Sequence, residues 1–251
     1  MSIVDEIIEK KRERLAEAME RTPLNELRQR AQQAEEPRDF MAAITREKGQ
    51  GLRLIAELKK ASPSMGLIRA DFEPEEIAQI FATRAEAMSV LTEEDYFEGS
   101  LDLIGRTKAV SPLPALRKDF IFDDYQVYEA RAAGADAILL IAMALEDSQA
   151  SELMALADEL SMDVLFEVHE FEELERALEL EATIIGMNNR DLRTMETDLL
   201  HTLEIMREVP SGITMVSESG ISTHEDVLRL EDAGVDAMLV GTALMCEHDI
   251  A

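Results

Sequence analysis

The sequence predicts one α/β domain of the (β/α)8 type, a TIM barrel, with an N-terminal helical extension and a last helix that is short or missing. Short apolar runs typical of β-strands recur eight times, separated by amphipathic segments with helical spacing, at intervals of roughly 25 to 30 residues. Several of these runs end in a side chain that binds anions or moves protons. Such side chains gather at the carboxyl ends of the strands in a barrel active site.

The N-terminal extension is expected to comprise residues 1–50 and to cover one end of the barrel. Residues 3–20 carry apolar side chains at helical spacing, which predicts a helix. The polar stretch that follows contains Pro23 and Pro37 as helix breakers. Because the apolar content of the extension is too small for a separate core, we expect residues 1–251 to form a single domain.

The barrel strands are expected at the short apolar runs, residues 52–58, 87–92, 114–117, 136–141, 163–168, 183–187, 213–217 and 236–240. Helices are expected between them, at residues 75–84, 101–108, 124–133, 148–160, 172–180, 198–209 and 223–233. Eight repeats favour a closed barrel over an open sheet, which would carry a glycine fingerprint after its first strand. Only six residues follow Met245, so the last helix is expected to be short or missing.

The acidic composition argues against two classes of partner. The 25 basic and 53 acidic residues give a net charge of −28, a field that neither nucleic acid nor an anionic membrane surface would tolerate. The apolar stretches are too short to span a bilayer, and the charged N-terminus lacks the features of a secretory signal. Cys246 is the only cysteine, so no intrachain disulfide forms, and the reducing cytoplasm is the expected location.

The carboxylates are spread along the whole chain, which indicates adaptation to a high-salt cytoplasm rather than an acidic tail. At ~1 M salt the Debye length is ~3 Å, so the mutual repulsion of surface carboxylates is screened. An ordinary acidic soluble protein is the alternative interpretation. The expected assembly is a monomer or a weak homodimer.

Charged side chains follow the first and third predicted strands on the side that faces the barrel interior. The alternation of the first strand directs Glu57 and Lys59 inward and Leu58 outward. Burying a carboxylate beside an ammonium group is costly unless the two pair or serve a ligand, so a structural ion pair is the alternative to a binding role. Lys118, one of only seven lysines, follows the third strand with the same inward phase.

Glu167 lies at the end of the fifth predicted strand, among apolar residues. These neighbours should raise its pKa, as an acid–base catalyst requires, unless a lysine such as Lys59 or Lys118 stands opposite. Glu93 is similarly placed after the second strand. Phe120, two residues beyond Lys118, is expected to form an apolar wall.

Polar groups suited to anions follow the remaining strands. Asn188 and Arg190 offer a carboxamide and a planar guanidinium, a pairing suited to a substrate carboxylate. The two loops after the last two strands are rich in small residues, and their backbone N–H groups make a phosphate site of the usual barrel kind. Either loop alone would be a tight turn and little more. The residues concerned are Glu218, Ser219, Gly220, Gly241 and Thr242, with Ser62 in a rigid turn after the first strand.

No metal or cofactor is expected. The four histidines are scattered, Cys246 stands alone, and no spacing typical of metal ligands occurs. The sequence also lacks a fingerprint for flavin or nicotinamide binding.

Seven segments, in this order, resemble those of the indole-3-glycerol-phosphate synthase family of tryptophan biosynthesis. They are IAELKKASPS, SVLTE, LRKDFIFDDYQVYEARAAGADAILLI, FEVH, GMNNRDL, SESGI and VGTALM, between residues 50 and 245. LRKDF and NNRDL are the specific ones, since phosphate-binding barrels share loops such as SESGI. The resemblance implies closure of the indole ring of 1-(2-carboxyphenylamino)-1-deoxyribulose 5-phosphate, with release of CO2 and water and without metal or organic cofactor.

By this resemblance, Lys118 is the general acid that activates the carbonyl, and Glu167 transfers a proton in the dehydration. Lys59 matches a lysine near the substrate carboxylate and is a second candidate acid. The other matching positions form a polar shell (Glu57, Asn188, Arg190 and Glu218), the phosphate contacts (Ser62, Ser219, Gly220, Gly241 and Thr242) and the apolar contact with the ring (Phe120). Ala61 and Met65 depart from the usual first loop, which bears on the phosphate contacts.

Three other interpretations stay open. An enzyme of the phosphoribosylanthranilate isomerase type usually runs on a Cys/Asp pair at strand ends, whereas Cys246 follows the last strand. A non-catalytic barrel retained for binding or assembly would be expected to lack Lys118 or Glu167, and both are present. A domain cut from a bifunctional chain would be expected to end in a linker, and none is seen before Ala251.

Overall fold

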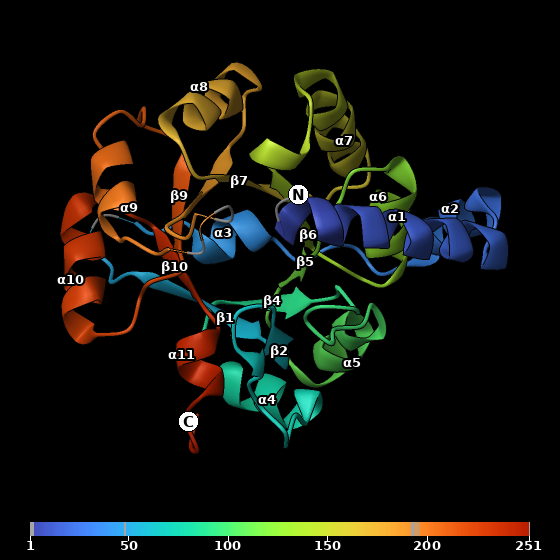
Figure 1. Ribbon diagram of the computed structural model, residues 1–251, viewed down its shortest axis with the longest axis horizontal. Coiled ribbons are helices and arrows are strands. Elements are labelled where there is room, and N and C mark those ends of the chain that lie inside the picture. Colours follow the sequence, from blue (N-terminus) through green and yellow to red (C-terminus); the bar gives the residue numbers. More distant parts are fainter. Residues whose placement is uncertain (1–2, 48, 192–193, 195, 251) are drawn as a thin grey trace.

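The computed structural model describes residues 3–47, 49–191, 194 and 196–250, and it contains a closed barrel of eight parallel strands ringed by helices (Figure 1). The barrel strands are β1 (Arg53–Leu58), β4 (Ala87–Leu91), β5 (Ala115–Lys118), β6 (Ala137–Ile141), β7 (Asp163–Val168), β8 (Ile184–Asn188), β9 (Thr214–Glu218) and β10 (Ala237–Val240). Strand β1 closes the barrel by pairing with both β4 and β10. The predicted fold class is confirmed.

Each predicted helix between the strands is present. They are α4 (Pro74–Phe81), α5 (Asp102–Val110), α6 (Asp124–Ala132), α7 (Asp147–Glu159), α8 (Phe171–Glu179), α9 (Leu200–Ile205) and α10 (His224–Ala233), with a short 3-10 helix, η1 (Ala142–Ala144), before α7. Side chains fix several helix starts, as where Thr223 and Asp226 form a reciprocal capping box on α10. The last helix, α11 (Thr242–Met245), has only four residues, in agreement with the prediction that it is short or missing.

The strand alternation sorts the apolar side chains into two cores. Inward residues such as Ile55, Leu116 and Leu165 fill the barrel centre. Outward residues such as Leu58 and Phe166 pack against the surrounding helices. The side-chain period of a strand is two, so Glu57, two residues after Ile55, also points into the barrel. It lies near the carboxyl end of β1 and therefore lines the pocket there.

The N-terminal extension contacts both ends of the barrel, whereas the sequence predicted a cover over one end. It consists of α1 (Ile3–Arg21), α2 (Leu24–Gln33) and α3 (Phe40–Ile44). Phe40 and Ile44 are fully buried against the barrel centre and close its amino-terminal end. Helix α1 lies across the opposite, carboxyl-terminal end, and α2 packs on α6 (Figure 1). The apolar spacing identified a buried face but not the surface it covers.

Three aspartates at the amino ends of strands hold the segment around α3 in place. Each carboxylate accepts a hydrogen bond from a backbone N–H of the extension, which satisfies donors that would otherwise be buried without partners. The pairs are Arg38 with Asp136 (2.7 Å), Met41 with Asp163 (2.9 Å) and Arg46 with Asp236 (3.3 Å). Two of these aspartates end the AGAD and AGVD segments, which therefore anchor the extension as well as turning helix into strand.

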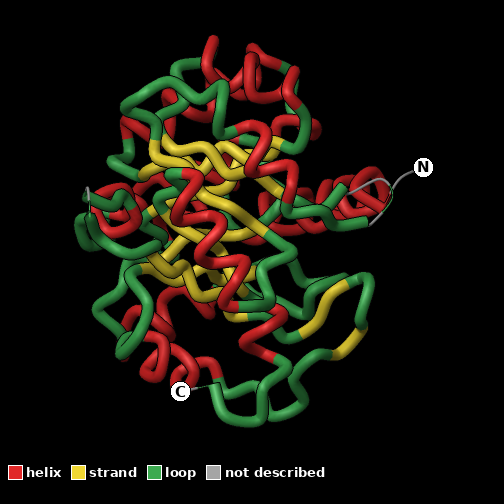
Figure 2. Tube along the Cα trace, turned by 90° about the vertical axis from the view of Figure 1, so that its left-hand side faces the viewer, coloured by secondary structure: helices red, strands yellow, loops and turns green. Residues whose placement is uncertain are grey.

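A small hairpin, β2 (Ala61–Ser62) with β3 (Gly66–Leu67), follows β1. In Figure 2 this hairpin and the N-terminal end of the chain lie on the same side of the barrel strands. Both elements therefore border the carboxyl-terminal mouth of the barrel. Of the helices in the described ranges, none has the length and hydrophobicity of a membrane span.

Candidate active site

A pocket opens at the carboxyl ends of the barrel strands and brings together every candidate site residue of the sequence. Its polar lining includes Glu57, Lys59, Ser62, Glu93, Lys118, Glu167, Asn188, Arg190, Glu218, Ser219 and Thr242, with Gly220 and Gly241 between them. Its apolar lining includes Phe120, Leu139, Ile141 and Leu239, together with Ile3, Val4 and Ile7 from α1. The pocket therefore has a floor of charged groups, and its apolar side chains come from α1 and from strands on opposite sides of the barrel.

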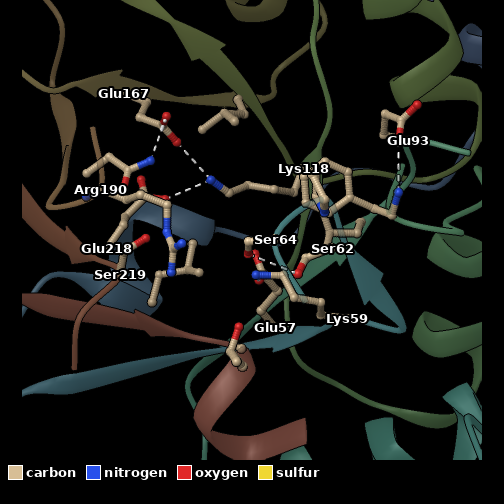
Figure 3. A pocket seen from close by; sticks show the side chains of 18 of the residues that line it. Glu57, Lys59, Ser62, Ser64, Glu93, Lys118, Glu167, Arg190, Glu218 and Ser219 are labelled. Carbon is tan, nitrogen blue, oxygen red and sulfur yellow. Dashed lines mark hydrogen bonds and ion pairs between the residues drawn. The ribbon is translucent and has the colours of Figure 1, made fainter. Parts of the chain in front are cut away.

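Lys118 is at the centre of the charged floor, held between two carboxylates (Figure 3). Its Nζ lies 2.8 Å from Glu167 Oε2 and 2.7 Å from Glu218 Oε2. Burial alone would lower the pKa of Lys118, but the charges of Glu167, Glu218 and Glu57 outweigh it and raise the pKa. The ammonium group is therefore protonated at neutral pH, the form that a proton donor must have.

Glu167 and Glu218 share the lysine but differ in proton affinity. Burial favours protonation of Glu167, but Lys118 and the Asn188 carboxamide (Nδ2 to Oε1, 3.1 Å) hold its pKa below the usual range. Burial raises the pKa of Glu218 to about 7, against the pull of Lys118, and the nearby Glu167 charge adds to the rise. Glu218 Oε1 is buried without a hydrogen-bond partner. The two carboxylates thus bind a proton as a coupled pair.

Glu57 and Lys59, which strand alternation directed to the same inward face, form an ion pair. Lys59 Nζ lies 2.6 Å from Glu57 Oε1, and the Ser89 hydroxyl lies 3.4 Å from Glu57 Oε2. Glu57 is buried, whereas Lys59 is half-buried and faces the pocket. Ser89 was not among the residues predicted from the sequence, although its inward position on β4 could have identified it.

Two glycines leave room for the buried carboxylates. A Cβ atom on Gly241 would overlap with Glu57 Oε1, and one on Gly186 would overlap with Glu218 Oε1. Gly186 lies on the inner face of β8, beside β9. The carboxylates of Glu57 and Glu218 therefore fill space that a neighbouring side chain would otherwise occupy.

Replacing Gly186 with alanine should displace the Glu218 carboxylate from Lys118. We expect a loss of unfolding free energy of about 1–3 kcal/mol, the usual cost of adding a methyl group to a packed interior, together with a loss of activity. Urea denaturation and steady-state kinetics measure both. Gly105→Ala on α5, where a Cβ has ordinary contacts, is the control and should leave stability unchanged or raise it by up to about 1 kcal/mol. A Gly186→Ala enzyme as stable and active as the wild type would contradict this packing.

The small-residue loops meet on one side of the pocket. Ser219 and Gly220 both adopt left-handed backbone conformations, with φ of 65° and 76°. Gly241 lies directly before α11, and Thr242 is its first residue. The Ser62 hydroxyl, in the hairpin after β1, accepts the Met65 N–H at 3.3 Å and lines the same pocket. Loops far apart in the sequence therefore present backbone and hydroxyl groups to one space.

Arg190 and Glu93 both line the pocket. The backbone N–H of Arg190 donates to Asn188 Oδ1 at 3.0 Å. The Glu93 carboxylate accepts the backbone N–H groups of Asp95, Tyr96 and Phe97 at 2.7 to 3.0 Å. Burial raises the pKa of Glu93. Its first role is therefore to shape the loop after β4, and the predicted substrate contact stays a prediction.

A buried polar network behind Lys118 was not predicted from the sequence. Asp119 is buried and accepts from Lys11 Nζ (2.9 Å), Arg117 Nη2 (3.0 Å) and Thr92 Oγ1 (2.6 Å). Because Lys11 belongs to α1, the network ties the pocket's cover to the strand that carries Lys118. The signal was present in LRKDF, where charged residues also occupy the two outward positions beside the lysine.

The acids best placed to hold a metal ion, among those in the described ranges, are Glu93, Glu94 and Asp95. Their oxygens are already engaged. Glu94 and Asp95 pair with Lys11 and Arg14 of α1, at 2.9 and 2.7 Å, and Glu93 binds backbone N–H groups. The arrangement serves to hold α1 across the mouth.

The fold and the pocket define a (β/α)8-barrel enzyme whose acid–base groups are gathered at the carboxyl ends of its strands. The family model described as "Indole-3-glycerol phosphate synthase" matches residues 4–251. The chain belongs to the indole-3-glycerol phosphate synthase family, which confirms the family and the function in tryptophan biosynthesis that the motifs predicted.

Curated relatives with this name match the chain over nearly their whole length. The indole-3-glycerol phosphate synthase of Polaromonas naphthalenivorans is 50% identical over 97% of this chain and 93% of its own. The proteins of that name from Acidithiobacillus ferrooxidans (49%, covering 97% and 93%) and Chromobacterium violaceum (48%, covering 98% and 94%) are similarly close.

Solved structures of low identity share the fold. The 3-hexulose-6-phosphate synthase of Salmonella typhimurium superposes with a TM-score of 0.64 at 16% identity, covering 80% of this chain and 93% of that one. The N-acetylmannosamine-6-phosphate 2-epimerase of Clostridium perfringens gives 0.62 at 15%, covering 83% and 92%. At this identity the likeness concerns the barrel alone.

Proposed function

We propose that this pocket closes the indole ring of 1-(2-carboxyphenylamino)-1-deoxyribulose 5-phosphate as a carboxy-lyase that needs no metal or organic cofactor. The observation that carries the proposal is the buried cluster of Lys118 with Glu167 and Glu218, in a pocket that Arg190 and several apolar side chains also line. The substrate has a carboxylate, an aromatic ring, a ketone and a phosphate, and the pocket offers a matching group for each.

Lys118 is the general acid of the first step. The ring carbon that bears the carboxylate attacks the ketone carbon, and the ketone oxygen takes a proton from the Lys118 ammonium to become a hydroxyl. The carboxylate then leaves as CO2, and its bonding electrons restore the aromatic ring. A positioned general acid of this kind is worth about 10²–10⁴-fold in rate.

Glu167 serves the dehydration that follows. The new hydroxyl takes a proton from Lys59, the second candidate acid, and leaves as water. Glu167 removes a proton from the ring carbon between the hydroxyl-bearing carbon and the nitrogen, and the electrons of that C–H bond form the double bond of the indole. The pKa of Glu167 is held below the usual range by Lys118 and Asn188 despite burial, so Glu167 is ionised and ready to accept that proton. Lys59, across the pocket, stays a second candidate for proton donation.

The remaining residues bind and orient the substrate. We assign the substrate carboxylate to Lys59 and Arg190, and the ring to Phe120 and the aliphatic side chains of α1. We assign the phosphate to Ser62, Ser219, Gly220, Gly241 and Thr242. The polar shell that holds the lysines consists of Glu57, Asn188 and Glu218. Glu93 shapes the loop beside them. A proton on Glu218 removes one negative charge from beside Lys118, which makes the local field more favourable to an anionic substrate.

The test is to incubate the purified protein with this substrate in KCl and a chelator and to follow indole fluorescence. Product without added metal or cofactor is the expected result. A folded protein that yields no product would favour the non-catalytic barrel, and turnover of phosphoribosylanthranilate instead would favour the isomerase type. Both outcomes contradict the proposal.

Salt adaptation is a proposal that rests on the charge alone. With a net charge of −28, the folded chain repels itself, and this repulsion is screened once the Debye length falls to ~3 Å at ~1 M salt. We expect the urea midpoint to rise steadily from ~0.1 to ~3 M KCl. The same series in sucrose controls for preferential exclusion. A midpoint indifferent to KCl would favour the ordinary acidic protein.

We also propose that the chain works as a single domain, with residues 1–50 as its extension, and as a monomer or weak homodimer in the cytoplasm. Support for the single domain comes from the apolar residues that α1 and α3 contribute to the pocket and to the barrel centre. The single cysteine favours a reducing compartment, and the net charge disfavours nucleic acid and anionic membranes as partners.

A further inference from the structure

Asn189 is a buried amide that no step of the proposed reaction uses. It follows β8, and its side chain is 0% exposed. Its Nδ2 donates to the Ser217 hydroxyl (3.0 Å) and to the backbone carbonyls of Glu218 (2.9 Å) and Ser219 (3.1 Å). Its Oδ1 accepts from the backbone N–H (3.1 Å) and the hydroxyl (2.8 Å) of Thr202 on α9. The side chain therefore joins the loop after β9 to the helix that follows β8.

The partners leave one orientation for this amide. Carbonyl oxygens only accept hydrogen bonds, and the Thr202 N–H only donates. A flipped amide would set Oδ1 against the two carbonyls of Glu218 and Ser219 and leave the Thr202 N–H facing a donor. Because the Asn189 side chain is fully buried, each lost partner would leave a buried polar group unsatisfied.

Anchoring two carbonyls also sets the direction of two N–H groups. A trans peptide unit is planar, with its C=O and N–H pointing to opposite sides. The carbonyl of Glu218 shares its unit with the N–H of Ser219, and the carbonyl of Ser219 shares its unit with the N–H of Gly220. Since both carbonyls point to Asn189, both N–H groups point away from it. Ser219 and Gly220 line the pocket.

The backbone at this loop needs such an anchor. Ser219 holds a φ of 65°, a conformation that non-glycine residues adopt only when their surroundings over-determine it. The Glu218 carbonyl keeps a second bond, from the Asn189 backbone N–H at 2.9 Å, so the side chain matters most for the Ser219 carbonyl. Removing the carboxamide should therefore release the peptide unit that carries the Gly220 N–H.

We propose that Asn189 is a positioning residue for phosphate binding: by holding the carbonyls of Glu218 and Ser219, it directs the N–H groups of Ser219 and Gly220 at the substrate phosphate. The inference rests on the proposed function, which assigns the phosphate to this loop. Asn189 does not touch the reacting atoms, so its removal should affect binding of the phosphate more than the chemical step.

The experiment compares Asn189→Ala with Ser217→Ala in the full chain, with inorganic phosphate as a competitive inhibitor. Ser217→Ala removes a hydroxyl from the same network but leaves both carbonyl contacts of Asn189 intact. For Asn189→Ala we expect KM and the inhibition constant of phosphate to rise together by at least about tenfold, with kcat changed by less than about threefold. For Ser217→Ala both constants should stay within about twofold of the wild type, although both variants melt at lower temperature.

Asn189→Asp is the second variant if the alanine protein does not fold. It keeps the side-chain volume and the acceptor for Thr202 but removes the donor to the carbonyls, and the same rise in both constants is expected. Unchanged KM and phosphate inhibition in a folded Asn189 variant overturn the role of Asn189 alone. A wild-type enzyme that phosphate does not inhibit competitively overturns the phosphate assignment and this inference with it. The fluorescence assay tests ring closure independently of both.

Discussion

Replacing Lys118 with alanine should lower kcat by at least about 10²–10⁴-fold, because in the proposed reaction the ketone oxygen then lacks its proton donor. The change also leaves Glu167 and Glu218 facing one another without the ammonium that lies 2.8 and 2.7 Å from them. Breaking a buried ion pair in this way costs about 3–5 kcal/mol of unfolding free energy, part of which the pair recovers by keeping a proton. Stopped assays of indole-3-glycerol phosphate formation measure the loss of kcat, and urea denaturation measures the loss of stability.

Lys118→Arg is the matched control for charge. A guanidinium keeps the positive charge beside both carboxylates, but its planar, longer head group cannot place an N–H where the compact ammonium group meets the ketone oxygen. We expect the arginine variant to retain most of the stability and still to lose most of kcat. An alanine variant that keeps over half of the wild-type rate with an unchanged circular dichroism spectrum would remove Lys118 from the role of acid.

The second large effect is expected for Glu167→Gln. The amide keeps the shape and a contact with Lys118 but cannot accept a proton, so kcat should fall by about 10²–10⁴-fold. The pKa of Glu218, about 7, is raised first by burial and also by the charge of Glu167, and that second contribution disappears in the variant. The pKa of Glu218 should then move down.

The pH profile of kcat/KM distinguishes this coupling from a simple loss of rate. A proton on Glu218 favours the anionic substrate, so kcat/KM of the wild type should decline as the pH rises through about 7. In Glu167→Gln the decline should begin at lower pH. Asn188→Ala, which removes the 3.1 Å bond to Glu167 but no charge, is the control and should leave the midpoint close to that of the wild type. A midpoint that stays in place in Glu167→Gln would mean that the two carboxylates titrate independently.

The sequence was sufficient to predict which side chains enter the barrel. Glu57, Lys118 and Glu167 follow apolar runs whose period of two fixes their face, and the inward phase is the same in the structure. What the period cannot give is which inward residues meet across the barrel. Lys118 on β5 reaches Glu218 on β9 because the barrel is closed and its strands are staggered, a property of the whole sheet.

Two further features lay beyond the sequence for a different reason. The pKa of Glu167 depends on whether a lysine stands opposite, which only the three-dimensional arrangement decides. Asn188 and Asn189 are adjacent and identical in type, yet one faces the pocket and the other the packing behind it. Strand parity separates the two, but the carbonyls that Asn189 holds belong to a loop thirty residues away.

The contacts of the segment around α3 also constrain the order in which the chain becomes structured during its synthesis. Arg38, Met41 and Arg46 emerge from the ribosome early, but their acceptors come 98, 122 and 190 residues later. Contacts between residues so far apart in sequence form slowly, because the chain between them loses conformational entropy before the contacts stabilise it. The extension is therefore made first and seated last, and until Asp236 has been synthesised the apolar Phe40 and Ile44 are exposed to chaperones and to other nascent chains.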